Sequence, residues 1–239
     1  MPKDKEKPQT TRRDFLRKSL SLIPLTIVAP SVMTSASAAT GSEGVVNDYM
    51  PNFFNNSEWD FILAAVDRLI PVDENGPGGV SEGVPIFIDK QMEMPYGWGQ
   101  LWYMHPPFVS AIPELGYQSH FVPREIYRQG IKMLNNHCIK KYGKPFHLLN
   151  IAEQDNILRE AEKDAIQDGN INSKLFFTQL LENTKEGYLA DPVHGGNQTL
   201  ASWKLIGFPG ARADYLDTVH RPGQPYPYGP VSISRKRGT

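Results

Sequence analysis

The sequence predicts a mainly α-helical protein, made of one small helical domain with long irregular loops and an extended C-terminal tail. Three observations lead to this prediction. Apolar residues recur at helical spacing in several segments after residue 56, whereas runs in which apolar and polar residues alternate, as in strands, are scarce. The chain also contains 20 glycines and 20 prolines, a content that favours long, shaped loops. Its 239 residues suit one domain with a leader and a tail.

Five segments are predicted to be helices, because each combines helical spacing with a recognisable start or stop. Ser57 can cap the first helix, and Pro71 ends it because proline lacks a backbone N–H and its ring clashes with the preceding turn. Prolines also suit the first turn of the second and third helices. Asn150 and Glu153 have capping-box spacing at the start of the fourth. The expected helices cover residues 57–70, 85–94, 123–142, 152–164 and 174–189.

Residues 1–38 are predicted to be an export signal. An arginine pair is followed by two apolar residues and a basic residue, which is the pattern that the twin-arginine translocase reads. The apolar run behind it is interrupted by prolines and is shorter than the roughly 20 residues that a membrane-spanning helix needs. Small residues then supply a cleavage site, so we expect the mature chain to begin at Ala39. The signal residues are Arg12, Arg13, Phe15 and Leu16, and the cleavage-site residues are Ala36 and Ala38.

The rest of the chain is mildly acidic and shows no motif for a bound cofactor. Residues 1–38 hold seven of the 25 Lys and Arg residues and three of the 26 Asp and Glu residues, which leaves 18 basic and 23 acidic residues. This balance argues against nucleic acid as a partner. No G-x-G-x-x-G pattern opens a helix, no C-x-x-C-H motif is present, and one cysteine cannot hold an iron–sulfur cluster. The twin-arginine route carries folded proteins, so we expect the cofactor to belong to a partner exported with this chain.

The most unusual segment spans residues 187–217, and we call its central part, residues 191–210, the signature loop. Asp191-Pro192 ends the preceding helix because proline cannot continue it. Gly195-Gly196 and Asn197 then permit a tight turn with positive φ. A dense apolar cluster follows and is closed by a proline and a glycine; it comprises Trp203, Leu205, Ile206 and Phe208.

The six histidines are scattered rather than spaced as metal-binding pairs, so we assign no metal ligand and no catalytic residue to this chain. His194 lies in the signature loop near Asp191, but no nucleophile or cofactor motif accompanies it. Asp191, His194 and Asn197 are interpreted instead as fixing the loop by hydrogen bonds to its backbone.

Two stretches, DPVHGGN at residues 191–197 and WKLIGFPGA at residues 203–211, resemble the gluconate 2-dehydrogenase subunit 3 family. Residues 69–89 match it as well, and residues 121–134 match more weakly. The resemblance implies a small, non-catalytic subunit of a membrane-associated, FAD-dependent dehydrogenase that oxidises sugars, sugar alcohols or sugar acids in the bacterial periplasm. It also implies two partners, a large FAD-containing subunit and a multihaem cytochrome c subunit, with membrane association only through the complex.

Within such a complex the small subunit would carry the export signal, help the flavoprotein fold and clamp it. The substrate is not named by the sequence, because its pocket would lie in the flavoprotein. The alternative function is that of a stand-alone exported helical protein that binds a ligand or a metal.

Residues 95–122 form a long aromatic loop, rich in Tyr, Trp and Phe among Pro, Gly and His. Loops of this length are uncommon and are often functional, and such side chains are favoured at the centres of interfaces. Packing onto the chain's own core is the equally weighted alternative. The expected partner interface combines this loop, the signature loop and the tail, and its residues are Trp98, Trp102, Tyr103, His194, Gly195, Gly196, Asn197, Trp203, Phe208 and Pro209.

Three further features leave alternatives open. Cys138 is either a buried thiol or a disulfide bridge to the flavoprotein, because an odd cysteine in an oxidising compartment has no partner in its own chain. The acidic, glycine-rich loop at residues 72–82 either binds a hard cation or is a solvated turn. The Pro-rich tail at residues 221–239 is either disordered or extended along a partner. Between leader and tail we expect a loose arm at residues 39–56 and the helical domain at residues 57–220.

Overall fold

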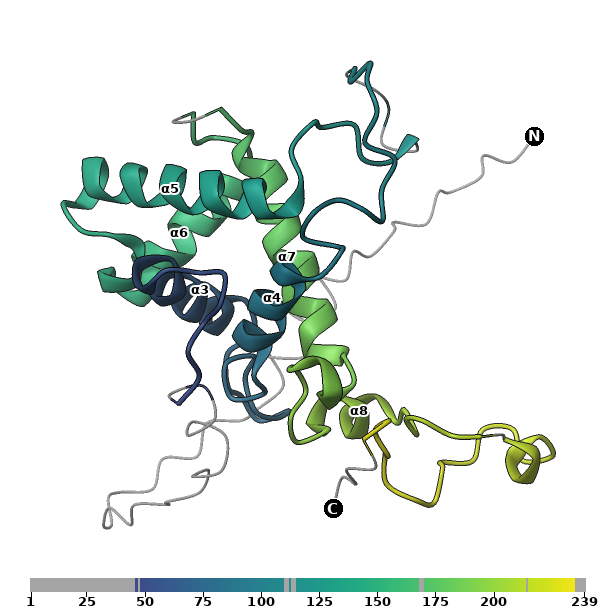
Figure 1. Cartoon of the computed structure of the whole chain (residues 1–239). Coiled ribbons are helices and arrows are strands. Elements are labelled where there is room, and N and C mark those ends of the chain that lie inside the picture. Colours follow the sequence, from purple (N-terminus) through teal and green to yellow (C-terminus); the bar gives the residue numbers. More distant parts are fainter. Residues whose placement is uncertain are drawn as a thin grey trace, which may run out of the picture. The chain divides into compact units, whose positions relative to one another are not determined.

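The computed structural model describes residues 46, 48–109, 112, 115–167, 170–213 and 215–234, without the side chain of Asp217. Within this part of the chain lie six α-helices, three short 3₁₀ helices and no β-strand (Figure 1). The mainly helical fold expected from the sequence is confirmed. The elements are α3 (Asn56–Leu69), α4 (Val84–Glu93), α5 (Pro123–Tyr142), η2 (Phe146–Leu148), α6 (Ile151–Glu162), α7 (Ser173–Leu189), η3 (Pro192–His194), α8 (Ala201–Ile206) and η4 (Leu216–Thr218).

Helix α7 organises the core, because it contacts α4, α5 and α6, while α3 covers α4 and α6. Four aromatic side chains are completely buried there. The ring centroids of Phe61 and Phe146 lie 4.7 Å apart, and those of Tyr127 and Phe176 lie 5.9 Å apart. Gly130 allows α5 to approach α7, since a Cβ at that position would lie 2.2 Å from the Phe176 ring. Burial of each such ring stabilises the fold by roughly 2–3 kcal/mol.

Local sequence signals locate three helix boundaries, both ends of α5 and the start of α6. Helix α5 begins at Pro123, and Gly143 ends it in the left-handed region with a φ of 72°. Helix α6 begins with the predicted capping box, in which the Asn150 side chain accepts from the Glu153 N–H at 3.0 Å and the Glu153 carboxylate accepts from the Asn150 N–H at 3.1 Å. Two otherwise unpaired N–H groups are thereby satisfied.

The cap predicted for the first helix is wrong. Asn55, rather than Ser57, caps α3, and it forms a reciprocal capping box with Glu58 in which both hydrogen bonds are 3.0 Å long. The sequence holds this pattern two residues upstream of the serine. Asn55 has the Glu that a capping box requires three positions on, whereas the residue three after Ser57 is the shorter Asp60.

The expectation of a loose N-terminal arm is wrong for residues 49–55. Phe53 and Phe54 are buried, and the carboxylate of Asp89 in α4 holds the backbone around them. Asp89 is fully buried and accepts four hydrogen bonds of 2.8–3.0 Å. Its donors are the Tyr49 hydroxyl and the backbone N–H groups of Asn52, Phe53 and Phe54. The arm is therefore part of the core from Tyr49 onward.

We expect Asp89→Ala to lower the free energy of unfolding by about 3 kcal/mol or more, because it strands three backbone donors in the core. Denaturant unfolding of the mature chain measures this loss. Asp67→Ala is the matched control, since Asp67 lies on α3 with a side chain 54% exposed, and it should change stability by less than about 0.5 kcal/mol. Similar small losses for both variants would contradict the role given to Asp89.

Candidate partner interface

Glycine contacts fix the signature loop against the ends of two helices. At Gly196 an added Cβ would lie 2.0 Å from the carbonyl oxygen of Gly187 in α7. At Gly83, which precedes α4 with a φ of 76°, an added Cβ would lie 2.6 Å from the carbonyl oxygen of Gly195. No side chain fits at either contact, so the backbones themselves touch. The loop is thus joined to α4 and α7 without an intervening side-chain layer.

A buried carboxylate reinforces this junction. Glu82 is fully buried and accepts from the Thr199 backbone N–H at 2.9 Å and from the Thr199 hydroxyl at 2.5 Å. The Glu82 carbonyl also accepts from the Gln198 N–H at 3.2 Å. The loop at residues 72–82 contains three acidic residues, Asp73, Glu74 and Glu82. Of these, Glu82 binds the signature loop rather than facing a cation site. Among the described residues no group of three or more His, Cys, Asp or Glu side chains is placed to hold a metal.

Two of the three polar residues expected to fix the signature loop do so. Asn197 is buried with a φ of 46°, donates to the Ala190 carbonyl at 3.0 Å and accepts from the Ser202 hydroxyl at 2.8 Å. Asp191 accepts from the Val193 N–H at 3.0 Å with one carboxylate oxygen. Its other oxygen accepts from the N–H of Ile233 at 2.8 Å. The His194 side chain is exposed on the loop instead.

The apolar cluster of the signature loop divides into an inner and an outer part. Sequence patterns did not predict a helix here, yet residues 201–206 form α8. Trp203 is buried, donates from its ring nitrogen to the Leu189 carbonyl at 2.7 Å, and meets the Phe208 ring edge-on at 4.9 Å. The other members face solvent, with exposed fractions of 56% for Leu205, 60% for Ile206 and 43% for Phe208. Pro209 is half-buried beside them.

Both alternatives for the aromatic loop hold, but for different residues. Trp102 packs inward between Tyr96 and Tyr117, with ring centroids 5.7 and 4.6 Å away. The Tyr96 hydroxyl accepts from the Asn183 amide of α7 at 2.8 Å, which ties this inner row to the core. Burial is the main cause that raises the pKa of Tyr96 to about 12, so the hydroxyl stays protonated.

The outer row of the aromatic loop is open to solvent. Trp98 is 54% exposed and stacks on the Arg124 guanidinium, whose carbon lies 4.0 Å from the ring centroid. Leu101 is 69% exposed and Tyr103 is 84% exposed. Of the three interface residues predicted in this loop, Trp98 and Tyr103 are therefore accessible, whereas Trp102 is half-buried.

The tail returns to the chain's own signature loop. Gly210 and Val231 form an isolated parallel bridge, in which the Ala211 N–H donates to the Val231 carbonyl at 2.7 Å and the Val231 N–H donates to the Pro209 carbonyl at 3.2 Å. Residues 230–233 therefore lie along this chain's own signature loop, and contact of the tail with a partner stays a prediction. Residues 211–230, which we call the arch, form a loop closed at its base.

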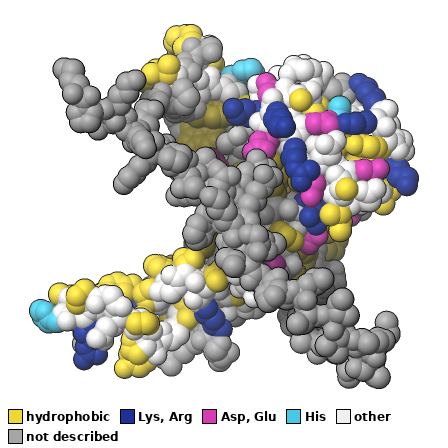
Figure 2. All heavy atoms as spheres, turned by 180° about the vertical axis from the view of Figure 1, so that it is seen from behind, with side chains coloured by type: hydrophobic (Ala, Val, Ile, Leu, Met, Phe, Trp, Pro, Cys, Tyr) yellow, Lys and Arg dark blue, Asp and Glu magenta, His cyan; other side chains and the backbone are white. Residues whose placement is uncertain are grey.

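Side chains of different character gather on different parts of the described surface. Figure 2 shows Lys, Arg, Asp and Glu side chains interspersed over the helical body, whereas hydrophobic side chains are prominent on the arch and α8 at lower left. The large exposed apolar residues of the arch are Tyr215, Leu216, Val219 and Tyr228. Tyr228 lines a groove together with Phe208, so the arch adjoins the outer part of the α8 cluster there.

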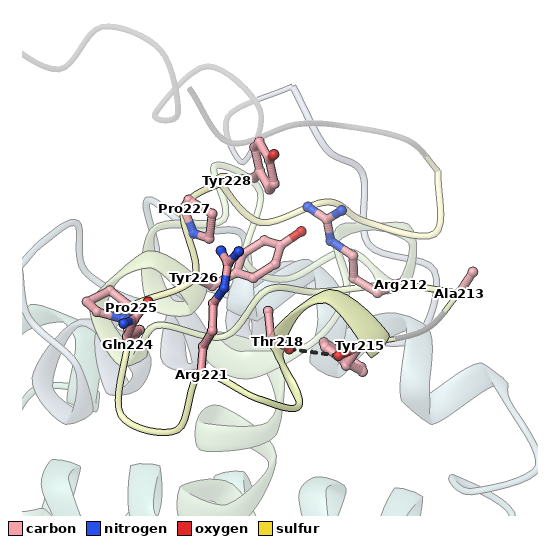
Figure 3. A pocket seen from close by; sticks show the side chains of 10 residues that line it. All are labelled: Arg212, Ala213, Tyr215, Thr218, Arg221, Gln224, Pro225, Tyr226, Pro227 and Tyr228. Atoms are coloured by element: carbon pink, nitrogen blue, oxygen red, sulfur yellow. Dashed lines mark hydrogen bonds between the residues drawn. The ribbon is translucent and has the colours of Figure 1, made fainter.

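A cavity of about 590 Å³ lies within the arch (Figure 3). It was not predicted from the sequence, because the cation-bearing and aromatic residues that line it are spread over 17 positions of an irregular segment. Arginines and tyrosines are interleaved along this segment, and this pattern was the one sequence feature that could have indicated an anion-binding cavity. The cavity is lined by Arg212, Ala213, Tyr215, Thr218, Arg221, Gln224, Pro225, Tyr226, Pro227 and Tyr228.

We compared the sequence with models of known protein families to identify the domain on which this candidate interface lies. The model of the family described as gluconate 2-dehydrogenase subunit 3 matches residues 56–210. The chain belongs to the gluconate 2-dehydrogenase subunit 3 family. No curated protein and no solved structure matches the chain.

The match locates the family domain in the structure. It begins at the start of α3 and ends at Gly210, so it includes the aromatic loop, the glycine junction and the signature loop. The arch follows directly after it. The subunit 3 family places this chain in the context of a dehydrogenase complex. In the described part of the chain, no helix has the length and apolar character needed to cross a bilayer.

The export and cleavage residues lie outside the described residues. These are Arg12, Arg13, Phe15, Leu16, Ala36 and Ala38. Their roles remain sequence predictions, as does the domain boundary at residue 38.

Cys138 is completely buried in α5. Burial, with a smaller contribution from the nearby Glu160 carboxylate, raises the pKa of its thiol to about 12. Of the two alternatives for this residue, the structure shows the buried thiol. The bridge to the flavoprotein stays a prediction that the following experiment tests.

We expect Cys138 to be unreactive in the folded chain. At pH 8 a thiol with a pKa near 12 is ionised in only about one molecule in 10⁴, and the thiolate is the nucleophile. Treatment with 5,5′-dithiobis(2-nitrobenzoic acid) should therefore release no thionitrobenzoate from the native protein and one equivalent after unfolding in guanidinium. Non-reducing gels of the complex should show the same bands for the wild type and Cys138→Ser. A larger band seen only for the wild type would show that Cys138 forms a disulfide with another subunit.

We expect Gly83→Ala to destabilise the domain more than Gly143→Ala. Both glycines have a φ near 75°, so both substitutions incur the left-handed backbone cost of roughly 1 kcal/mol. Only Gly83 faces the Gly195 carbonyl, whereas nothing lies within 4 Å of a Cβ at Gly143. Steric overlap should add about 1–3 kcal/mol at Gly83. Denaturant unfolding measures the difference, and equal losses would show that the junction tolerates a methyl group.

Proposed function

We propose that this chain is the non-catalytic small subunit of a periplasmic, FAD-dependent dehydrogenase complex. It supplies the twin-arginine export signal and stabilises the folded flavoprotein subunit. FAD belongs to that large subunit, and haem c belongs to a cytochrome subunit that passes electrons onward. Residues of this chain hold no cofactor in the proposal.

The observation that carries this proposal is the exposure of large apolar side chains on loops of a well-packed family domain. Leu205, Ile206 and Phe208 project from the signature loop, while Trp98 and Tyr103 project from the aromatic loop. Clusters of large exposed apolar side chains, such as the three on and beside α8, are typical of interfaces. Aromatic anchors at such surfaces contribute most of the binding free energy.

The architecture beneath these residues also favours a binding role. Backbone contacts at Gly83 and Gly196 and the buried Glu82 carboxylate hold the signature loop in one conformation. A preordered loop loses little conformational entropy when it binds. In this proposal the buried Gly195, Gly196 and Asn197 shape the loop, and the buried Trp203 supports it from within. Phe208 and Pro209 present its apolar surface, and His194 is exposed on the same loop.

The complex can be isolated from the native host through a tag on this chain, without denaturant. We expect a flavin absorbance spectrum and a larger second chain, and we expect both to disappear from the periplasm when Arg12 and Arg13 are changed to Lys. Mass spectrometry identifies the second chain. A colourless single chain would overturn the proposal and favour the stand-alone binding protein.

The interface is tested by a double variant, Ile206→Ser with Phe208→Ser, against the control Ile139→Ser. Ile139 is 51% exposed on α5 and lies outside the proposed interface. Loss of two anchors should weaken flavoprotein retention by about 2 kcal/mol or more, that is about thirtyfold. The control should leave retention unchanged. Equal retention by all three proteins would exclude the α8 surface from the interface.

A further inference from the structure

The arch is a preformed structure that begins where the family match ends. Its two legs meet at the Gly210–Val231 bridge, and a Cβ at Gly210 would lie 2.2 Å from the Val231 carbonyl oxygen. The Tyr215 hydroxyl donates back to the Gly210 carbonyl at 3.3 Å, and Asp191 holds Ile233 just beyond the base. The cavity inside the arch is therefore built by a closed loop, which lowers the entropy cost of filling it.

Arg212 is held over aromatic rings in a way that leaves its donors available. Its guanidinium carbon lies 4.4 Å from the centroid of the Tyr226 ring and 5.7 Å from that of Tyr228. Those rings pack edge-to-face at 5.5 Å. Stacking orients the plane of the guanidinium while its N–H edges remain free to pair with an anion. The Arg212 Nε is buried and has no hydrogen-bond partner among the described residues, and a buried donor of this kind calls for an acceptor.

Arg221 brings a second positive charge to the same cavity. Figure 3 shows Arg212 and Arg221 reaching it from separate stretches of the arch, with Tyr226 drawn between them. Neither guanidinium forms an ion pair with a described carboxylate; Asp214 and the Asp217 side chain are outside the described residues. Two like charges lining one cavity favour an anion between them, and arginine pairs bidentately with carboxylates.

A second groove, lined mainly by aromatic and proline residues and also by Lys204, adjoins this cavity. It measures about 540 Å³ and shares residues 224–228 with the first cavity. Trp203, Phe208 and Pro209 line it, so it adjoins the proposed α8 interface. A free small acid would leave the aromatic and proline surface of the second groove uncovered. A protein segment with an acidic side chain next to apolar ones matches both.

We propose that the arch is a docking site for an acidic segment of the flavoprotein subunit, one carboxylate of which binds in the cavity that Arg212 and Arg221 line. This inference rests on the proposed function, because it specifies how the partner is recognised. The apolar neighbours of that carboxylate lie in the groove along Phe208. Recognition by a paired carboxylate adds orientation to an interface whose remaining contacts are apolar and non-directional.

The first test measures retention of the flavoprotein by variants of the tagged complex at increasing salt. Arg212→Glu with Arg221→Glu should weaken retention at least about thirtyfold and remove most of its salt dependence. Lys132→Glu reverses an exposed charge on α5 and should change retention by less than about twofold. An unchanged melting temperature of the free double variant shows that the fold survives. Unchanged retention by the double variant would overturn the docking site.

The second test identifies the bound carboxylate. Arg212→Lys retains the charge and supplies an amine, which a water-soluble carbodiimide joins to an adjacent carboxylate as an amide while the carbodiimide becomes a urea. Peptide mapping should find position 212 linked to an Asp or Glu of the flavoprotein. A link only to Asp214 or Asp217 of the same chain, or no link, would overturn the inference.

These outcomes separate the two proposals. If the wild-type chain retains a flavoprotein but the arch variants behave like Lys132→Glu, the docking site is wrong and the small-subunit function stands. If the wild-type chain retains none, both fail.

Discussion

The signature loop depends on a place where two stretches of backbone touch without side chains between them. Gly196 contacts the end of α7 at Gly187, and Gly195 contacts Gly83 ahead of α4. A Cβ at Gly196 would lie 2.0 Å from the Gly187 carbonyl oxygen, and a Cβ at Gly83 would lie 2.6 Å from the Gly195 carbonyl oxygen, so either would force the loop away from the helices. The exposed positions of Phe208 and its neighbours follow from this contact, because α8 begins only a few residues after it. The glycines therefore act through geometry and need no contact with the partner.

Three carboxylates, of which Asp89 and Glu82 are buried and Asp191 is partly exposed, also hold the loops in place. Asp89 accepts hydrogen bonds from backbone N–H groups of the N-terminal arm. Glu82 accepts one from the signature loop, and Asp191, within that loop, accepts one from the tail. In each case a charged acceptor satisfies backbone N–H groups of a segment that has no regular secondary structure. Hydrogen bonds to a charged acceptor are roughly twice as strong as neutral ones. A domain with long loops can keep them ordered in this way without a sheet.

Features encoded by neighbouring residues were predictable, and features that join distant residues were not. The capping box at Asn150, the proline start and the glycine stop of α5 are all readable within four residues. Glu82 could not be assigned, since its partner Thr199 is 117 positions away and an acidic residue among glycines also fits a solvated turn. Helix α8 was missed because it is six residues long and Leu200 gives it no side-chain cap.

The candidate interface was predictable in outline and not in detail. The sequence indicated the aromatic loop and the signature loop, but residue type alone cannot tell Trp102, which packs inward, from Trp98, which faces solvent. The proline-rich tail was recognised as extended, yet nothing local specifies that Val231 returns to Gly210. The pairing of Val231 with Gly210 depends on tertiary contacts, which leave no periodic pattern in the sequence from which it could be predicted.

The span of the Glu82–Thr199 contact has a consequence for how the chain folds. Helical proteins fold fast when their contacts are local, and each long closure slows the search. Here the bonds that order the loops join residues 37, 117 and 42 positions apart. The helices can form early, while the loops become ordered only when the ends of the family domain have met. An export route that accepts only finished folds, as proposed for this chain, allows time for that slow last step.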